Sequence, residues 1–86
     1  MKIKYHRRFE KQFKKLTPKL KQKTLEIIQE FIVNPYEKLL KNHSLHGTLS
    51  DKKAISITKD IRAIFQEFDD YTIVIFLNIG THNKVY

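Results

Sequence analysis

The chain has 86 residues, and 17 Lys and Arg against nine Asp and Glu give it a formal net charge of +8. This length predicts one small domain, residues 1–86, with a single core. The 41% hydrophobic content argues against a disordered tail, and the absence of cysteine excludes disulfides and thiolate chemistry. No apolar run reaches the ~20 residues that span a bilayer, and the N-terminus lacks the apolar stretch of a secretion signal, so we expect a cytoplasmic protein without membrane association.

Positive charge is concentrated at the N-terminal end, where Glu10 is the only acid among the first 23 residues. The ten cations of this block are Lys2, Lys4, Arg7, Arg8, Lys11, Lys14, Lys15, Lys19, Lys21 and Lys23. Such a block attracts polyanions, with binding that weakens as salt rises. On charge alone, nucleic-acid binding and a solubilising surface that docks an acidic partner both remain open.

Apolar spacing predicts a short strand followed by two helices. Ile3 and Tyr5 alternate with lysines, which is typical of a strand. Phe9, Phe13 and Leu16 then follow at helical spacing. Thr17-Pro18 fits the start of a second amphipathic helix, which should end before Asn34-Pro35.

The second half of the chain changes to strand-like patterns after an irregular stretch over 36–48. Residues 54–58 alternate, and 61–68 and 71–79 are rich in β-branched and aromatic residues. Asp69-Asp70 between the last two predicts a hairpin turn. The order is β-α-α-β-β-β, which predicts an α+β fold with a small antiparallel sheet and two helices on one face.

Four features interrupt this pattern: the segment from His43 to Gly47, Asp60 with Arg62, His82 after Gly80-Thr81, and Tyr86. Each alone is weak evidence, because a lone histidine is commonly a surface residue. Asp60 and Arg62 would by default form a surface ion pair, if they share one face of a regular strand. A zinc site built from His43, His46, Asp60 and His82 is an alternative, but the histidines are scattered and cysteine is absent, so we expect no metal.

Together these features resemble the RelE/ParE toxin superfamily, and they are most similar to its RelE/YafQ-like branch of type II toxin–antitoxin systems. The matching stretches are Asn34-Pro35 through Leu40, His43-x-Leu45-x-Gly47, Ile55-Ser56-Ile57-x-x-Asp60-x-Arg62-x-Ile64-Phe65 and Ile79-Gly80-Thr81-His82-x-x-Val85-Tyr86. The resemblance covers nearly the whole chain. It implies a microbial RNase-like fold and an mRNA interferase, a ribosome-dependent endoribonuclease that cleaves mRNA in the A site, inhibits translation and needs no metal or other cofactor. It also implies a cognate antitoxin protein that silences the toxin, and a toxin–antitoxin complex that binds operator DNA through the antitoxin.

The resemblance also implies site residues. His43, Asp60 and His82 match functional positions of the YafQ-like pattern, Arg62 matches a catalytic arginine of the RelE pattern, and Tyr86 matches that pattern's C-terminal tyrosine. The sequence departs from the family at two positions. Ser56 stands where relatives carry a histidine or a lysine, and Ala54 stands where RelE-like toxins have a lysine. Three basic residues near these positions are further candidates for RNA contact: His46, Lys52 and Lys53.

Metal-free RNA cleavage needs a base for the attacking 2′-hydroxyl, cationic donors for the phosphorane oxygens and an acid for the departing 5′-oxygen. We expect His82 to be the principal acid/base, Arg62 the phosphate clamp and His43 the second proton carrier. Asp60 would orient a histidine or hold it protonated. For Tyr86 three roles stay open: a base with a lowered pKa, a ring that stacks on a nucleotide, or an aromatic that closes the core.

The basic helices are expected to contact rRNA phosphates, which position a protein without reading sequence. The residues concerned are Arg7, Arg8, Lys11, Lys14, Lys15, Lys19, Lys21 and Lys23. Two other functions remain on the same fold: a ParE-like toxin that binds DNA gyrase, and a degenerate toxin that serves only as an antitoxin-binding partner.

Overall fold

The computed structural model describes residues 1–85, apart from the side chains of Asn83 and Lys84. Its elements in chain order are β1 (Lys2–Tyr5), α1 (Arg7–Lys14), α2 (Pro18–Val33), η1 (Lys38–Leu40), β2 (His43–Ser44), η2 (Gly47–Leu49), β3 (Lys53–Ser56), β4 (Ile61–Phe68), β5 (Ile73–Thr81) and α3 (His82–Val85), where η marks a 3-10 helix. The strands form one sheet in the order β1-β5-β4-β3-β2. None of the helices in this described part is long and apolar enough to cross a membrane.

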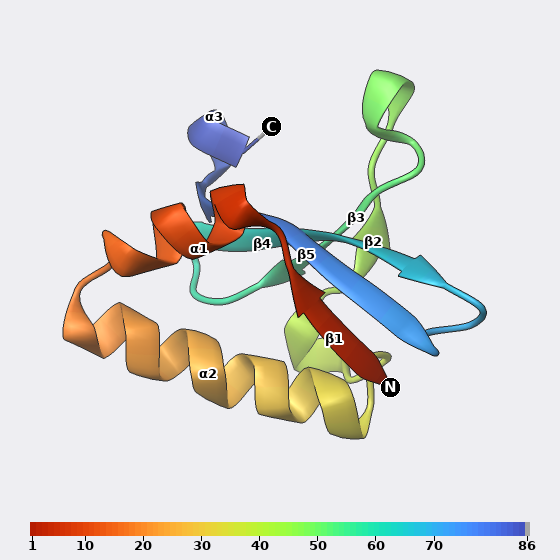
Figure 1. Cartoon of the computed structure of the whole chain (residues 1–86), viewed down its shortest axis with the longest axis horizontal. Helices are drawn as coiled ribbons and strands as arrows, with labels where there is room; N and C mark the ends of the chain where they lie inside the picture. The colour runs from red at the N-terminus through yellow and green to blue at the C-terminus, as the bar shows by residue number, and fades with distance from the viewer. Residues whose placement is uncertain (86) are drawn as a thin grey trace.

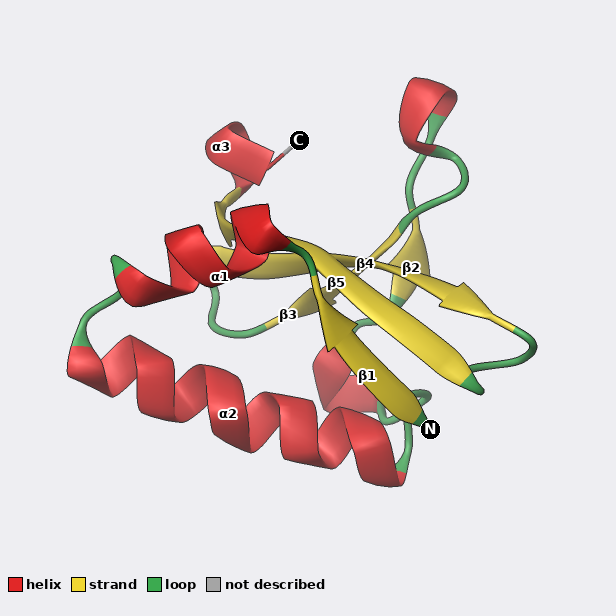
Figure 2. Ribbon diagram, in the orientation of Figure 1, coloured by secondary structure: helices red, strands yellow, loops and turns green. Residues whose placement is uncertain are grey.

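Figure 1 shows α2 running across one side of the sheet, while α3 and the green turn that contains η2 rise on the other side. Figure 2 distinguishes the elements by colour: α2 lies below the strands, α1 beside them, and α3 and the turn with η2 above them. The predicted α+β fold with two N-terminal helices is therefore confirmed.

The sheet differs from the predicted one in two details. β1 pairs with β5 in parallel, so the sheet is mixed, and only the β2-to-β5 part is antiparallel. The short strand β2 was not predicted and adds a fifth strand. Alternation along a sequence indicates that a segment is a strand, but it carries no information about its partner or direction, which contacts distant in sequence decide.

Local capping explains where the two long helices begin and end. The Thr17 side chain accepts a hydrogen bond from the Leu20 N–H at 3.2 Å, and Pro18 occupies the first turn, where its missing N–H costs nothing. α2 ends at Val33, and the C-cap residue Asn34 has the extended backbone that is favoured before a proline. α1 begins after His6, whose Nδ1 accepts from the Arg8 N–H at 3.0 Å. The predicted boundaries of the second helix are confirmed.

Aromatic packing fills the space between α2 and the sheet. Phe31 is fully buried, and its ring meets those of Phe65, Phe76 and Tyr71 edge-on at centroid distances of 5.0, 5.6 and 5.9 Å. Such edge-to-face pairs add to the stabilisation from buried apolar area. This cluster fixes α2 against β4 and β5, the two strands that carry most of the sheet.

A bulge in β5 resets which residues face the helices. Phe65 pairs with Phe76 but Ile64 pairs with Asn78, so Leu77 is the extra residue. Strict alternation from the buried Phe76 would turn Asn78 into the core. The bulge buries Ile79 instead, leaving Asn78 and Gly80 on the side of the sheet opposite α2.

Beyond the end of β1, a glutamine of α1 protects the outer edge of β5. The His6 N–H donates to the Phe76 carbonyl at 2.8 Å, where the parallel ladder stops. Gln12 then takes over: its Oε1 accepts from the Ile79 N–H at 2.8 Å, and its Nε2 lies 3.5 Å from the Asn78 Oδ1. A side chain thus replaces the missing strand and satisfies a backbone donor that would otherwise be left unpaired.

The β4–β5 turn is strained at Tyr71. Asp69 and Asp70 lie in the predicted turn and adopt positive φ. The turn also includes Tyr71, which was expected to begin the next strand; its φ of 66° is uncommon for an aromatic residue, and β5 begins only at Ile73. The Tyr71 N–H donates to the Glu67 Oε1 at 3.0 Å, and its hydroxyl accepts from Asn42 at 2.9 Å and from the Lys53 ammonium at 3.4 Å. These bonds hold the strained turn and attach the segment before β2 to it.

Glu67 should make stability depend on pH. The hydrogen bond from the Tyr71 N–H, assisted by Lys53 Nζ at 3.2 Å, lowers the pKa of the Glu67 carboxyl. A lowered folded-state pKa gives stability that is present above the ordinary pKa, near 4.3, and is lost as pH falls through the folded-state value. We therefore expect Glu67→Gln to cost about 1 kcal/mol of unfolding free energy at neutral pH and progressively less toward pH ~3. Denaturant unfolding of both proteins across this range measures the difference, with the exposed Glu26→Gln as control. A difference in unfolding free energy between wild type and Glu67→Gln that stays the same at all pH values would contradict this role.

Candidate nucleic-acid interface

The sheet face opposite α2 carries the residues that the sequence singled out. Cross-strand register places Ser56, Arg62 and Gly80 in one row across β3, β4 and β5. Directly paired residues of antiparallel strands point to the same face. Gly80 has no side chain, so it adds no side chain to this row beside Arg62.

A second row runs parallel to the first. His43 pairs with Ala54, Ala54 with Ile64, and Ile64 with Asn78. Two strand spacings and one two-residue step separate His43 from Arg62, which places their Cα atoms roughly 12 Å apart. His43 and Arg62 therefore lie on the same face of the sheet, in neighbouring rows.

A small apolar cluster supports this face. Leu45, Ala54 and Ile64 are buried together, and Leu49 of η2 and Val85 of α3 pack against them. The cluster therefore anchors the two segments that rise on this side of the sheet in Figure 1. The small side chain of Ala54 lets Leu45 and Ile64 meet.

Arg62 is held by the turn that precedes it. Its Nη1 donates to the carbonyls of Thr58 at 3.0 Å and Lys59 at 2.9 Å. The Thr58 hydroxyl in turn accepts from the N–H groups of Asp60 and Ile61 at 3.3 and 3.1 Å. Only one guanidinium nitrogen is used in this way among the described residues. The other nitrogens are left to a ligand, on an arginine whose position is already fixed.

The expected ion pair between Asp60 and Arg62 is absent. Asp60 lies in the turn before β4, so the alternation that would put both side chains on one face does not apply. Within the described residues the Asp60 carboxylate has no ion-pair or hydrogen-bond partner, and it is exposed to solvent.

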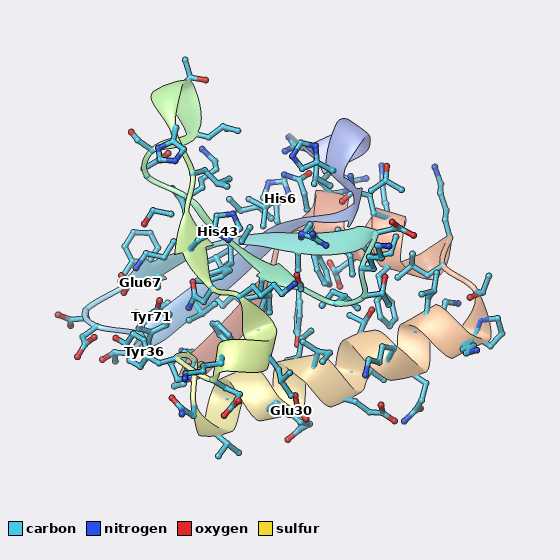
Figure 3. All side chains as sticks on the ribbon, turned by 180° about the vertical axis from the view of Figure 1, so that it is seen from behind. His6, Glu30, Tyr36, His43, Glu67 and Tyr71 are labelled. Carbon is cyan, nitrogen blue, oxygen red and sulfur yellow. The ribbon has the colours of Figure 1, made fainter. Side chains whose placement is uncertain are left out.

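His43 has a defined tautomer. Its Nδ1 lies 2.8 Å from the Lys41 carbonyl oxygen, which can only accept, so Nδ1 carries the proton. In the neutral ring Nε2 is then an unprotonated acceptor. The His43 side chain is exposed. In Figure 3 it lies on the side of the sheet away from Glu30 of α2. This arrangement presents a base to solvent.

His82 begins α3, immediately after Thr81, the residue that pairs with Ile61. Its backbone therefore lies close to the end of β4 where Arg62 projects, and its side chain is exposed. The structure thus brings His82, Arg62 and Ser56 to one end of the face and His43 to the neighbouring row. Tyr86 lies outside the described residues. α3 itself was not predicted, because four residues are too few to show a helical period.

The other predicted RNA-contacting residues fall into three groups. The cations of α1 and α2 are exposed except for Lys21, which is half-buried, and none of them forms an ion pair among the described residues. Lys52 is paired with Asp51 at 3.2 Å, which lowers the pKa of that carboxyl, and His46 is exposed before η2.

Lys53 faces the helix side, bound to Glu67 and Tyr71, and is not brought together with Arg62. Burial lowers the Lys53 pKa, but these two bonds outweigh that effect and raise it.

The zinc alternative finds no counterpart in the described residues: no three His, Cys, Asp or Glu side chains gather there as a metal ion would require. Sequence reasoning also missed Asn78, which joins the His43 row and contacts Gln12. A single polar residue inside the apolar run from Ile73 to Ile79 was the signal that could have found it.

Comparison with known proteins bears directly on this arrangement. A family model described as "Bacterial toxin of type II toxin-antitoxin system, YafQ" matches residues 1–86. The chain belongs to this family. It is thus a YafQ-like type II toxin, as the motifs around His43, Asp60 and His82 indicated. A comparison with curated protein sequences finds no match.

Solved structures of related toxins share the fold of this chain. YafQ from E. coli strain BL21(DE3) has a TM-score of 0.79 at 20% identity, covering 98% of this chain and 96% of its own. A YoeB/ParE toxin from Agrobacterium tumefaciens also has a TM-score of 0.79, at 15% identity, covering 95% and 99%. The E. coli DinJ–YafQ toxin–antitoxin complex contains a chain with a TM-score of 0.75 at 20% identity, covering 98% and 94%.

The assigned tautomer of His43 can be tested by imidazole ¹⁵N–¹H NMR at a pH where the ring is neutral. We expect the proton on Nδ1, because the Lys41 carbonyl accepts from it. His6 is an internal control with the opposite expectation, since its Nδ1 accepts from the Arg8 N–H and the proton must sit on Nε2. Finding the His43 proton on Nε2 would remove the argument for Nε2 as a base.

Proposed function

We propose that this toxin is a ribosome-dependent mRNA endoribonuclease. It cleaves translated mRNA in the ribosomal A site without a metal cofactor and so inhibits translation in the cytoplasm. The proposal is supported by the cross-strand register, which puts Arg62 and His43 on the sheet face opposite α2, and by the position of His82 directly after β5, next to the start of β4. A phosphate clamp and two proton carriers are the groups that this reaction needs.

The reaction begins with the 2′-hydroxyl of one nucleotide. Nε2 of His43 takes the hydroxyl proton, and the freed oxygen forms a bond to the adjacent phosphorus. Arg62 stabilises the negative charge that builds up on the non-bridging oxygens, using the guanidinium nitrogens that the turn carbonyls do not occupy. As the P–O5′ bond breaks, His82 gives a proton to the departing oxygen. The products are a 2′,3′-cyclic phosphate and a 5′-hydroxyl end.

The remaining site residues have supporting roles in the proposal. The unpartnered Asp60 carboxylate holds a histidine in its protonated form when substrate is bound. The exposed cations of α1 and α2, none of which is ion-paired with another described residue, contact rRNA phosphates. Tyr86 is proposed to act at the same face, either on the base or in proton transfer.

A cognate antitoxin is proposed to bind and silence the toxin. Membership of the YafQ family supports this partner, as does the E. coli complex in which YafQ is bound by DinJ. Through the antitoxin, the complex would also bind operator DNA.

The decisive measurement is 5′-end mapping of one mRNA translated in a purified system. His82→Ala should reduce cleavage by about 10²–10⁴-fold, because a proton carrier is lost. A matched control is His6→Ser, which also removes a histidine but keeps a side-chain cap for α1.

The mapped ends distinguish the possible functions of this fold. New in-frame ends that require ribosomes and disappear with His82→Ala are the expected result. Cuts in RNA without ribosomes would keep the nuclease but remove the A site. No cuts by folded wild-type protein would refute the nuclease and favour the gyrase-binding or degenerate-toxin alternatives.

Arg62 gives a second, independent prediction. Arg62→Ala should slow single-turnover cleavage by about 10²–10³-fold, and Arg62→Lys should slow it less, because lysine keeps the charge but loses the fork. Since Nη1 also supports the turn at Thr58 and Lys59, thermal unfolding of both variants is measured alongside. Equal cleavage rates for the two variants would show that no two-pronged contact with phosphate is made.

A further inference from the structure

The outer edge of β3 is open at one residue, Ser56. β2 covers β3 only at Lys53 and Ala54. The Ile57 N–H donates to the Ile61 carbonyl at 2.8 Å, so in the alternating antiparallel ladder the Ser56–Arg62 pair is the non-hydrogen-bonded kind. The Ser56 N–H and carbonyl therefore point away from β4, toward the open edge.

Lys41 is the residue that prevents β2 from closing this edge. Continuing the β2–β3 register by two residues would place Lys41 opposite Ser56. Lys41 instead adopts φ of 51°, its N–H donates to the Lys38 carbonyl at 3.1 Å, and its own carbonyl accepts from His43. Both backbone groups of Lys41 are thus used elsewhere, and the Ser56 N–H is left without a partner in the described part of the chain.

A hollow of about 300 Å³ lies at this open edge, between α2, the end of η1 and the β3–β4 turn. Its lining brings together four cations, Lys23, Lys41, Lys59 and Arg62, and one carboxylate, Glu30. Figure 3 places Glu30 on α2, on the far side of the sheet from His43. None of the four cations is ion-paired with any described residue, so their charge is available to a ligand.

We propose that this hollow binds the phosphate that neighbours the scissile phosphate of the RNA strand. The site would combine a backbone N–H from Ser56 with the ammonium groups of Lys41 and Lys59, a donor set suited to an anion. The inference rests on the proposed function, because Arg62 and Ser56 belong both to the catalytic row and to the lining of the hollow. A strand bound at Arg62 and continuing over β3 meets the hollow next.

An added peptide strand is the competing occupant, and the edge is poorly built for it. Strand addition needs several alternate residues with free backbone groups. Here Ala54 is already paired with β2, and Ile57 is bonded within the β3–β4 turn, which leaves Ser56 alone. Four cations around a single open donor fit a phosphate better than a peptide backbone.

The test uses a short single-stranded 2′-O-methyl oligoribonucleotide, which binds but has no free 2′-hydroxyl to react. Its affinity is measured by fluorescence anisotropy over a series of salt concentrations, for wild type and for the double variant Lys41→Gln/Lys59→Gln. The slope of log K against log salt falls by about 0.7 for each phosphate contact that is lost, and both lysines are proposed to hold the same phosphate, so the double variant should lose about 0.7. Lys38→Gln is the control: it removes one lysine charge three residues before Lys41 but lies outside the hollow, and its slope should stay near wild type.

A second series locates the contact along the strand. Each phosphate of the probe is replaced in turn by an uncharged methylphosphonate. Wild type should lose affinity when the phosphate next to the Arg62-bound one is neutralised, and the double variant should be insensitive at that position only. Equal slopes for wild type, double variant and Lys38→Gln would overturn the proposal. So would a double variant that binds the probe normally but loses affinity for the antitoxin.

These readouts separate this site from the nuclease. The probe is not cleaved, so the change in salt slope can be measured whether or not the toxin cleaves mRNA. Cleavage of mRNA together with an unchanged slope would reject the hollow alone. A changed slope together with absent cleavage would keep the hollow as an RNA contact and reject the nuclease.

Discussion

The pairing of β4 with both of its neighbours is the constraint on which the rest of the structure depends. One strand, Ile61–Phe68, turns Ala63 and Phe65 into the core beneath α2 and presents Arg62 and Ile64 on the opposite face. The core residues and the proposed site residue Arg62 therefore lie on the same strand, so their positions relative to each other are fixed. A one-residue shift of register would exchange the two faces, burying the guanidinium and exposing the aromatic ring.

Positions near the proposed site serve both structure and ligand. One guanidinium nitrogen of Arg62 donates to the turn carbonyls. These bonds orient the other two guanidinium nitrogens, with no carboxylate partner among the described residues. The Lys41 carbonyl sets the His43 tautomer, and the same left-handed residue stops β2 short of Ser56. One backbone irregularity thus explains both the orientation of a histidine and the open edge of β3.

Features set by neighbouring residues could be predicted from the sequence. The start of α2 at Thr17-Pro18 and its end before Pro35 follow from capping and from the proline, and the motifs around His43 and His82 were sufficient to indicate the family. Features set by distant contacts could not: the parallel partner of β1, and the bulge at Leu77 that turns Gly80 toward Arg62. The expected Asp60–Arg62 pair is absent because Asp60 lies in the turn before β4, where strand alternation does not set the direction of its side chain.

The parallel pairing of β1 with β5 also bears on how the toxin is made. Lys2 lies beside Ile73 and Tyr5 beside Phe76, so the first strand synthesised must wait for one of the last before it has a neighbour. Contacts this remote in sequence form slowly, because the entropy of closing the long loop between them must be overcome before the contact contributes any stability. Gly80 and His82 follow directly on the same late segment. A nascent chain therefore acquires its closed sheet and its proposed RNA-cutting face at nearly the same moment, and a shortened product released before residue 73 has neither.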